Sequence, residues 1–143
     1  TGFYRACDEL GLEIPEEYVR EGVYHDPDRC AELTQELLTL DVPPTCILMP
    51  DDISSIGGGN AIRRMGLRLP GDVSAAGYDG IQLSSVMSPA LTTYRQDTQA
   101  LGKTAAAKLI ELIEKPRTAL VDRILIPGRL VEGASVQAIE PQE

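Results

Sequence analysis

A nine-residue stretch in the middle of the chain decides its fold: PTCILMPDD, residues 44–52. Its apolar run TCILM is short and uninterrupted, as is typical of a parallel strand covered on both faces. Asp51 or Asp52 then begins a helix that reaches about Met65, and Asp52 is the preferred N-cap. A second strand follows over 72–78, so strand, helix and strand form one right-handed crossover unit.

The same alternation of helix and strand continues toward both ends of the chain. Asp26 and Pro27 mark the start of another helix, because an Asp caps the first turn and a Pro is preset for it. Three consecutive glycines at 57–59 let a second element approach their helix closely, although each costs about 1 kcal/mol in a helix interior. The other predicted elements are helices over 1–11, 27–40 and 98–114, a helical stretch over 81–87, and strands near 18–23, 91–95, 121–126 and 129–133. This order predicts an α/β fold on a parallel sheet.

Composition narrows the class of protein. A chain of 143 residues suits one α/β domain, and a net charge of −9 argues against binding of nucleic acid by this part of the protein. No apolar run is long enough to span a bilayer, so we expect no membrane contact. The cysteines Cys7, Cys30 and Cys46 show no metal-knuckle or disulfide spacing, which favours the reducing cytoplasm. Cys30 and Cys46 are expected in the core.

The candidate binding residues follow predicted strands. Asp51 and Asp52 come after the first strand, Asp79 ends the second, and Tyr24 follows the segment 18–23. Ligands of open parallel sheets bind beyond the carboxyl ends of the strands, so these side chains should converge on one crevice. Carboxylates accept hydrogen bonds from vicinal hydroxyls and an aromatic ring covers the apolar side of a sugar, so the cluster predicts a polyol site.

Each of these residues also has a structural explanation. Asp79 stands beside Gly80 and could be a turn residue, Tyr24 could pack at a strand end, and His25 is expected to be a solvated turn residue. A magnesium site of the phospho-acceptor kind is disfavoured, because the strand that ends at Arg95 is not followed by the required Lys. No nucleophile elbow, catalytic cysteine or phosphate loop is present in the sequence, so we expect no enzyme activity, no cofactor and no metal.

Ordered blocks of this sequence resemble the lactose-repressor (LacI/GalR-type) family of transcriptional regulators. The blocks are PTCILMPDD at 44–52, MGLRLPGDVS at 65–74, AGYD at 76–79 and SPALTTYRQ at 88–96. The resemblance implies a type I, periplasmic-binding-protein-like core of two lobes, of which this chain would hold an incomplete part. Residues 1–95 would supply most of the C-terminal lobe, 96–126 a helix and strand of the N-terminal lobe, and 127–143 a return strand and tail.

The same resemblance implies a function and its residues. The chain would bind a small-molecule effector, a sugar or polyol, and would form a homodimer, while DNA would be bound by a headpiece outside it. The implied effector contacts are Asp51, Asp79, Tyr24 and Thr98, and the implied dimer surface holds Ile56, Leu83, Val86 and Met87. The alternative is a solute-binding protein of a sugar transporter, and the ordered match over 66–96 favours the regulator.

The helix over 98–114 raises a separate expectation. It carries an apolar stripe of residues four apart, Leu101, Ala105, Leu109 and Ile113. The resemblance would assign this helix to the N-terminal lobe, most of which is not in the chain. We therefore expect the stripe to pair with a second copy of the chain or to pack in a non-native way.

Overall fold

The protein is built on one four-stranded sheet. The computed structural model describes residues 2–116, 118 and 123–138. The strands are β1 (Cys46–Leu48), β2 (Ser74–Asp79), β3 (Thr92–Arg95) and β4 (Arg129–Val131). They lie in the order β1-β2-β3-β4; the first three are parallel, and β4 runs antiparallel to β3. The predicted α/β class is thus confirmed, with one antiparallel strand at the sheet edge.

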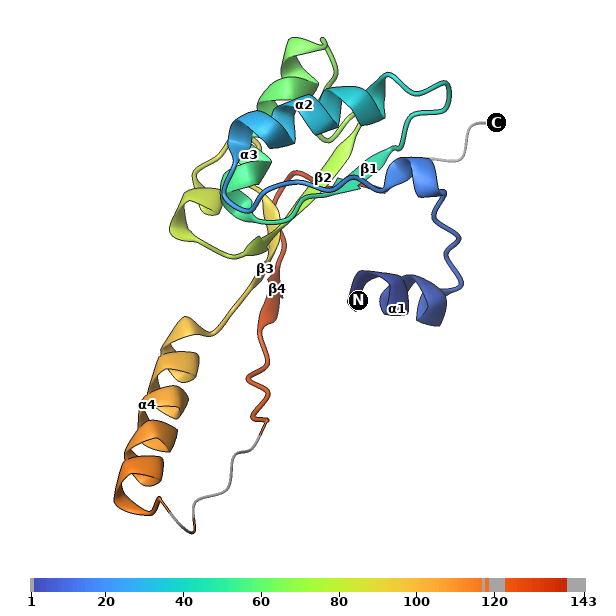
Figure 1. Cartoon of the computed structure of the whole chain (residues 1–143). Coiled ribbons are helices and arrows are strands. Elements are labelled where there is room, and N and C mark those ends of the chain that lie inside the picture. Colours follow the sequence, from blue (N-terminus) through green and yellow to red (C-terminus); the bar gives the residue numbers. More distant parts are fainter. Residues whose placement is uncertain (1, 117, 119–122, 139–143) are drawn as a thin grey trace.

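Two helices cover one face of this sheet (Figure 1). They are α2 (Pro27–Leu38) and α3 (Asp52–Arg64), and α3 is the crossover between β1 and β2. Asp26 caps α2 by accepting a hydrogen bond from the backbone NH of Arg29 at 2.9 Å, as the sequence predicts. Apolar side chains of the two helices, of β1 and β2 and of the residues that flank these strands form the core: Cys30, Leu37, Leu38, Ile47, Met49, Ile62, Val73 and Ala75.

The glycines of α3 bring the two helices together. A Cβ atom on Gly57 would lie 1.7 Å from the carbonyl oxygen of Pro27, and one on Gly58 would lie 2.3 Å from Cε of Met49. Only a glycine at position 57 lets the start of α2 approach so closely, while the space at Gly58 is filled by the side chain of Met49. The expectation of a close approach at these glycines is therefore confirmed.

The opposite face of the sheet is exposed at β1. The prediction that the run 45–49 is covered on both faces is wrong, because Cys46 is exposed and Leu48 is 59% exposed. Cys46 is therefore not a core residue, whereas Cys30 is buried as expected. No helix packs over these side chains in the part of the chain that the structure describes. The short helix α1 (Gly2–Leu10) lies apart from them (Figure 1).

Two predicted strands differ from the structure. The segment 18–23 forms no strand, because no neighbouring strand pairs with it; a short 3-10 helix, η1 (Glu16–Tyr18), includes its first residue instead. The side chain of Arg20 donates to nearby backbone carbonyls, including that of Glu17 at 2.6 Å. Of the strand predicted near 121–126, residues 121–122 lie outside the described residues and 123–126 form no strand. The helical stretch over 81–87 is a 3-10 helix, η2 (Gln82–Ser85).

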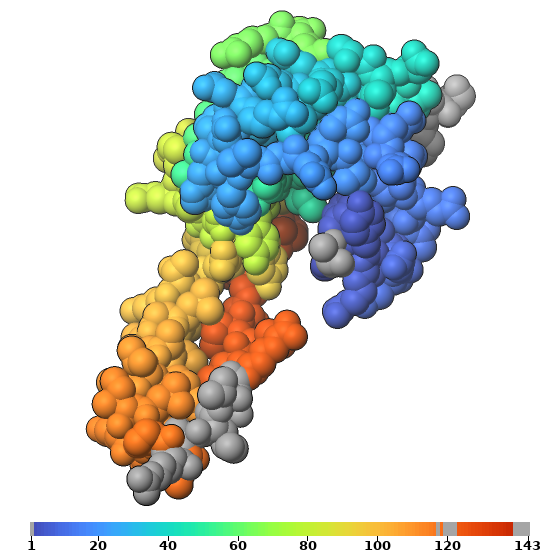
Figure 2. Space-filling model, viewed as in Figure 1, coloured from blue at the N-terminus to red at the C-terminus, as the bar shows by residue number. Residues whose placement is uncertain are grey.

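The helix α4 (Thr98–Glu114) extends away from the sheet (Figures 1 and 2). None of its residues is buried, and Leu109 and Ile113 of the apolar stripe are 59% and 70% exposed. The stripe thus does not pack on the rest of its own chain, and pairing with a second copy stays a prediction. Among the described residues, no helix combines the length and the apolar character needed to cross a membrane.

Candidate functional site

Asp51 lies just beyond the carboxyl end of β1 and is fully buried. One carboxylate oxygen accepts a hydrogen bond from the backbone NH of Ser54 at 2.8 Å. The other accepts from the hydroxyl of Ser54 at 2.7 Å and from the backbone NH of His25 at 3.0 Å. Asp51 is therefore the N-cap of α3, and the preference for Asp52 is wrong. The reason is conformational: Asp51 has extended backbone angles, whereas Asp52 is already the first helical residue.

These hydrogen bonds also set the charge of Asp51. Burial alone would raise the pKa of this carboxyl group, because it penalises the charged form. The NH groups of His25 and Ser54 and the Ser54 hydroxyl outweigh burial and hold the pKa of Asp51 below its ordinary value of 3.8. Asp51 therefore stays a carboxylate at neutral pH, fixed in place by three donors.

Asp79 ends the neighbouring strand β2 at the same edge of the sheet. Its oxygen Oδ1 accepts a hydrogen bond from the side-chain amide of Gln96 at 2.5 Å, and its Oδ2 lies 3.9 Å from Nε2 of His25. The backbone φ of Asp79 is 106° and that of Gly80 is 67°. A non-glycine residue held at such an angle costs about 1–3 kcal/mol, and such residues cluster at functional sites. Asp79 is thus both a turn residue and a candidate binding residue.

Tyr24 lies next to these carboxylates. Its side chain is 56% exposed, and its ring centroid is 5.1 Å from that of His25. Partial burial raises the pKa of the Tyr24 hydroxyl, and the negative charges of Asp79 and Asp51 raise it further. The structure therefore brings three of the predicted effector contacts, Tyr24, Asp51 and Asp79, to one edge of the sheet.

Sequence reasoning missed two members of this cluster. His25 is exposed, as expected of a solvated turn residue, but its NH binds Asp51 and its ring faces Asp79. It adopts a left-handed backbone angle, φ 58°, which directs both groups inward. Gln96 follows β3 and binds Asp79 through both its backbone NH and its side chain. His25 directly follows Tyr24, and Gln96 directly follows the strand that ends at Arg95. These positions are the signal that could have identified both residues.

Asp52 lies beneath the cluster rather than in it. It is 1% exposed and accepts hydrogen bonds from the backbone NH of Ile81 at 2.9 Å and from the hydroxyl of Thr93 at 2.6 Å. Its donors are all supplied by the protein, so it has a supporting position. In the described ranges, no group of three or more His, Cys, Asp or Glu side chains is arranged to hold a metal ion.

Thr98 lies in a neighbouring hollow. It is the exposed first residue of α4 and lines a cavity of about 500 Å³ that is formed by residues 95–99 and 127–129. Gln96 lines the same cavity and binds Asp79, so it joins the hollow to the carboxylate cluster. No recorded contact brings Thr98 itself to Asp51, Asp79 or Tyr24 within the described residues.

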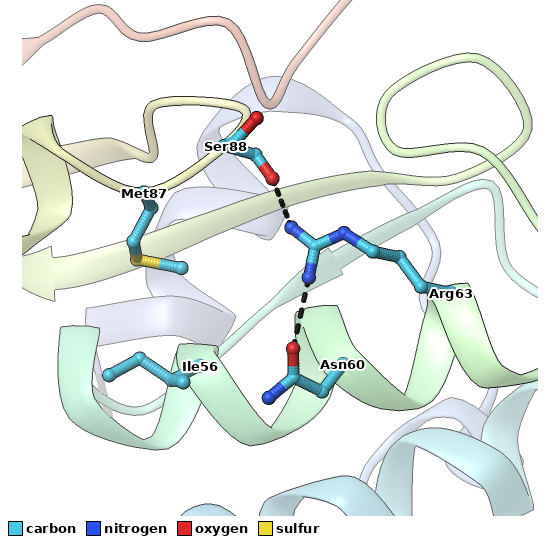
Figure 3. A pocket seen from close by; sticks show the side chains of 5 residues that line it. All are labelled: Ile56, Asn60, Arg63, Met87 and Ser88. Carbon is cyan, nitrogen blue, oxygen red and sulfur yellow. Dashed lines mark hydrogen bonds between the residues drawn. The ribbon is translucent and has the colours of Figure 1, made fainter.

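The predicted dimer residues lie on another part of the surface. Ile56 and Met87 line a hollow of about 350 Å³ together with Asn60, Arg63 and Ser88 (Figure 3). The guanidinium of Arg63 donates to Oδ1 of Asn60 at 3.0 Å and to the carbonyl of Ser88, so it fixes α3 to the turn before Pro89. Close to Met87 in sequence, Leu83 is 45% exposed and Val86 is 71% exposed.

Several proteins that this chain resembles regulate transcription. A family model described as a periplasmic binding protein-like domain matches residues 1–136. The chain is 38% identical over 114 residues to the HTH-type transcriptional repressor PurR of Pasteurella multocida (strain Pm70), covering 80% of this chain and 34% of the repressor. The transcriptional regulator LacI from Bacillus cereus subsp. cytotoxis gives a TM-score of 0.89 at 27% identity, covering 97% of this chain and 49% of that one.

A second solved structure is the lac repressor dimer bound to operator and the anti-inducer ONPF. Its TM-score is 0.85 at 29% identity, and the match covers 96% of this chain and 46% of that chain. The chain thus spans about a third of the length of the curated relative and about half of the solved chains.

Proposed function

The chain belongs to the periplasmic binding protein-like domain family, in its LacI-type repressor branch, and we propose that it is the ligand-sensing and dimerisation module of a DNA-binding repressor. The relatives are repressors and not enzymes, which agrees with a sensing role. With a net charge of −9, this module leaves DNA binding to another part of the protein. Because such a repressor must reach DNA, it acts in the cytoplasm.

The observation that carries this proposal is the convergence of Tyr24, Asp51 and Asp79 at the carboxyl edge of the sheet. Ligands of open parallel sheets bind at this edge. Asp79 keeps acceptor capacity on Oδ2, and the half-exposed ring of Tyr24 offers an apolar face beside it. A sugar or polyol suits this pair, because its vicinal hydroxyls donate to a carboxylate while its carbon face lies on an aromatic ring. Thr98 would contact the ligand from the adjoining hollow.

The test is an NMR titration of the chain with a panel of glucose, galactose, ribose, cellobiose and hypoxanthine. His25 is the one histidine of the sequence, so its imidazole C–H resonances report directly on the site. One sugar of the panel should shift these resonances, with weak affinity because a one-sided site buries little of a ligand. Asp79→Asn should abolish the shift, whereas Asp41→Asn, the same change at an exposed position, should preserve it. No response to any sugar would refute sugar binding at this edge.

The transporter alternative gains no support, because the curated relative and both solved structures described above are transcriptional regulators. A matching response to hypoxanthine alone would keep the sensor role and replace the sugar with a purine base. The Asp79→Asn control would then show whether the base occupies the same edge.

Dimerisation is proposed to use the surface that contains Ile56, Leu83, Val86 and Met87. Val86 is 71% exposed, and an isolated apolar cluster of this kind on a surface indicates a protein contact. A lac repressor of the same fold is a dimer. Val86→Asp should weaken self-association in sedimentation velocity, because it places a charge within the contact. Val42→Asp, at a 67% exposed position elsewhere, is the matched control, and an equal effect of both would contradict this surface.

A further inference from the structure

A buried pair of side chains holds the turn that follows β2. The hydroxyl of Thr93 donates to Oδ1 of Asp52 at 2.6 Å and accepts from the backbone NH of Gly80 at 3.3 Å. The other oxygen of Asp52 accepts from the backbone NH of Ile81 at 2.9 Å. Two successive NH groups after Asp79 are therefore bound from below by one hydroxyl and one carboxylate. We call Asp52 and Thr93 the turn clamp.

Space for the clamp is built into the sheet. Asp52 and Thr93 are each 1% exposed, so neither can exchange its partners for water. A Cβ atom on Gly77 of β2 would lie only 2.6 Å from Oδ1 of Asp52 and 2.9 Å from Oγ of Ser55. A larger residue at Gly77 would displace the carboxylate. The glycine in the strand thus makes room for the buried side chain of Asp52.

The clamp acts on the residue that most needs support. Asp79 has a φ of 106°, which a side-chain-bearing residue adopts only when its surroundings enforce it. Gln96 holds Asp79 from the side, by its backbone NH to the Asp79 carbonyl at 3.2 Å and by its side chain to Oδ1. Gln96 does not fix the next peptide groups; the turn clamp holds their NH groups, and Arg95 Nε donates to the Gly80 carbonyl at 2.9 Å. Without those anchors, Asp79 would relax toward the extended angles of the strand before it.

We propose that Asp52 and Thr93 are positioning residues that hold Asp79 in its left-handed conformation, so that its carboxylate faces the ligand edge. The orientation of the Asp79 carboxylate toward a ligand rests on the proposed function, whereas the effect of Asp52 and Thr93 on the Asp79 backbone does not. A carboxylate held in one pose binds a ligand without a further ordering cost. The clamp touches no ligand and acts only through the turn at Gly80 and Ile81.

The test is the backbone geometry of Asp79, measured by NMR without any ligand. The three-bond coupling between its amide and α protons is small at the φ of the structure and large in an extended strand. Thr93→Val should raise this coupling and should speed hydrogen exchange at Gly80 by about tenfold or more, because the NH loses its acceptor. Thr93→Ser keeps the hydroxyl and should preserve both values.

Thr92→Val is the matched control. Thr92 lies on the same strand and is also buried, and its hydroxyl accepts from the backbone NH of Gly133 at 3.0 Å, away from the turn. Thr92→Val should lower global stability without changing the Asp79 coupling. This result would distinguish positioning of Asp79 by Thr93 from a general contribution of a buried threonine to stability. If Thr93→Val does not fold, Asp52→Asn is measured with the same expectation.

Two results would overturn the clamp: an unchanged Asp79 coupling in folded Thr93→Val, or an equal change in Thr92→Val. A sugar panel without any response would count against the proposed ligand and not against the clamp, because the coupling is measured on the free chain. A response to sugar that Thr93→Val weakens and Thr93→Ser keeps would support both.

Discussion

Replacement of Gly57 by alanine tests whether the close approach of α2 and α3 supports the fold. The new Cβ would lie 1.7 Å from the carbonyl oxygen of Pro27 and 2.5 Å from its carbonyl carbon. Both are backbone atoms, so no side-chain rotation can relieve the clash. Since real Cβ contacts are essentially never shorter than 3.0 Å, the start of α2 must retreat by more than about 1 Å.

The size of the effect follows from two opposing terms. Alanine in place of glycine favours a helix by about 1 kcal/mol. Overpacking costs about 1–3 kcal/mol, and a clash with backbone belongs at or beyond the upper end of that range. Retreat of α2 also loosens the buried contacts of Leu33 and Leu37. Gly57→Ala should therefore lower the free energy of unfolding by about 2 kcal/mol.

The assay is urea unfolding followed by circular dichroism, with Gly102→Ala as the control. Gly102 lies in α4, and a Cβ there would meet nothing within 4 Å, so the same change should stabilise that helix by about 1 kcal/mol at most. The two substitutions thus have opposite expected signs. A Gly57→Ala variant as stable as the unmodified chain would refute the helix approach seen in the structure.

Three further predictions follow from single contacts. The lowered pKa of Asp51 stabilises the fold above the ordinary value of 3.8, and this contribution is lost as the pH falls through the lowered pKa. Asp51→Asn should therefore reduce the loss of urea stability on acidification; an unchanged acid dependence would contradict this. Ser135→Ala removes a buried hydroxyl that joins β2 to β3 by hydrogen bonds of 2.6 and 2.8 Å, and it should lower the free energy of unfolding by about 1–3 kcal/mol. Ser85→Ala, at an exposed position, should lower it by less than about 0.5 kcal/mol. Equal losses in the two variants would contradict this prediction. In a Val86→Asp background, residual self-association should use the stripe on α4, so Leu109→Lys should remove it in sedimentation velocity; persistence would rule the stripe out.

Much of the fold was predictable because local signals and long-range packing agree. The apolar run of β1 and the Asp-Pro start of α2 place those elements correctly. The segment 18–23 also contains apolar residues, Val19 and Val23, but forms no strand. A strand exists only when a neighbour supplies its hydrogen bonds, and no property of the segment itself reveals whether that neighbour is present.

The same limit explains the exposed face of the sheet. A continuous apolar run such as 45–49 predicts a strand with two covered faces, yet Leu48 is 59% exposed. An apolar run indicates that its side chains are suited to a buried environment. It does not report which elements of this chain are available to cover them.

The site shows why residue type alone does not predict which residue caps the helix and which lies in the core. Asp51 and Asp52 are adjacent and chemically identical, and sequence reasoning assigned the cap to the wrong one. Their backbone conformations separate them: Asp51 is extended and receives the NH of His25, whereas Asp52 is helical and binds Thr93 in the core. The first thereby lies at the carboxyl edge of the sheet and the second beneath it.

The backbone conformation of His25 connects the two carboxylates Asp51 and Asp79. Its left-handed φ of 58° lets one residue present its NH to Asp51 and its ring to Asp79, across two neighbouring strands. Such an angle is uncommon outside glycine and is stabilised by the contacts that it allows. The cluster therefore contains two non-glycine residues with positive φ, His25 and Asp79, whose side chains face each other. Asp79→Asn removes the carboxylate that faces the His25 ring and keeps the size of the side chain, so a ligand that needs this carboxylate should no longer shift the His25 resonances.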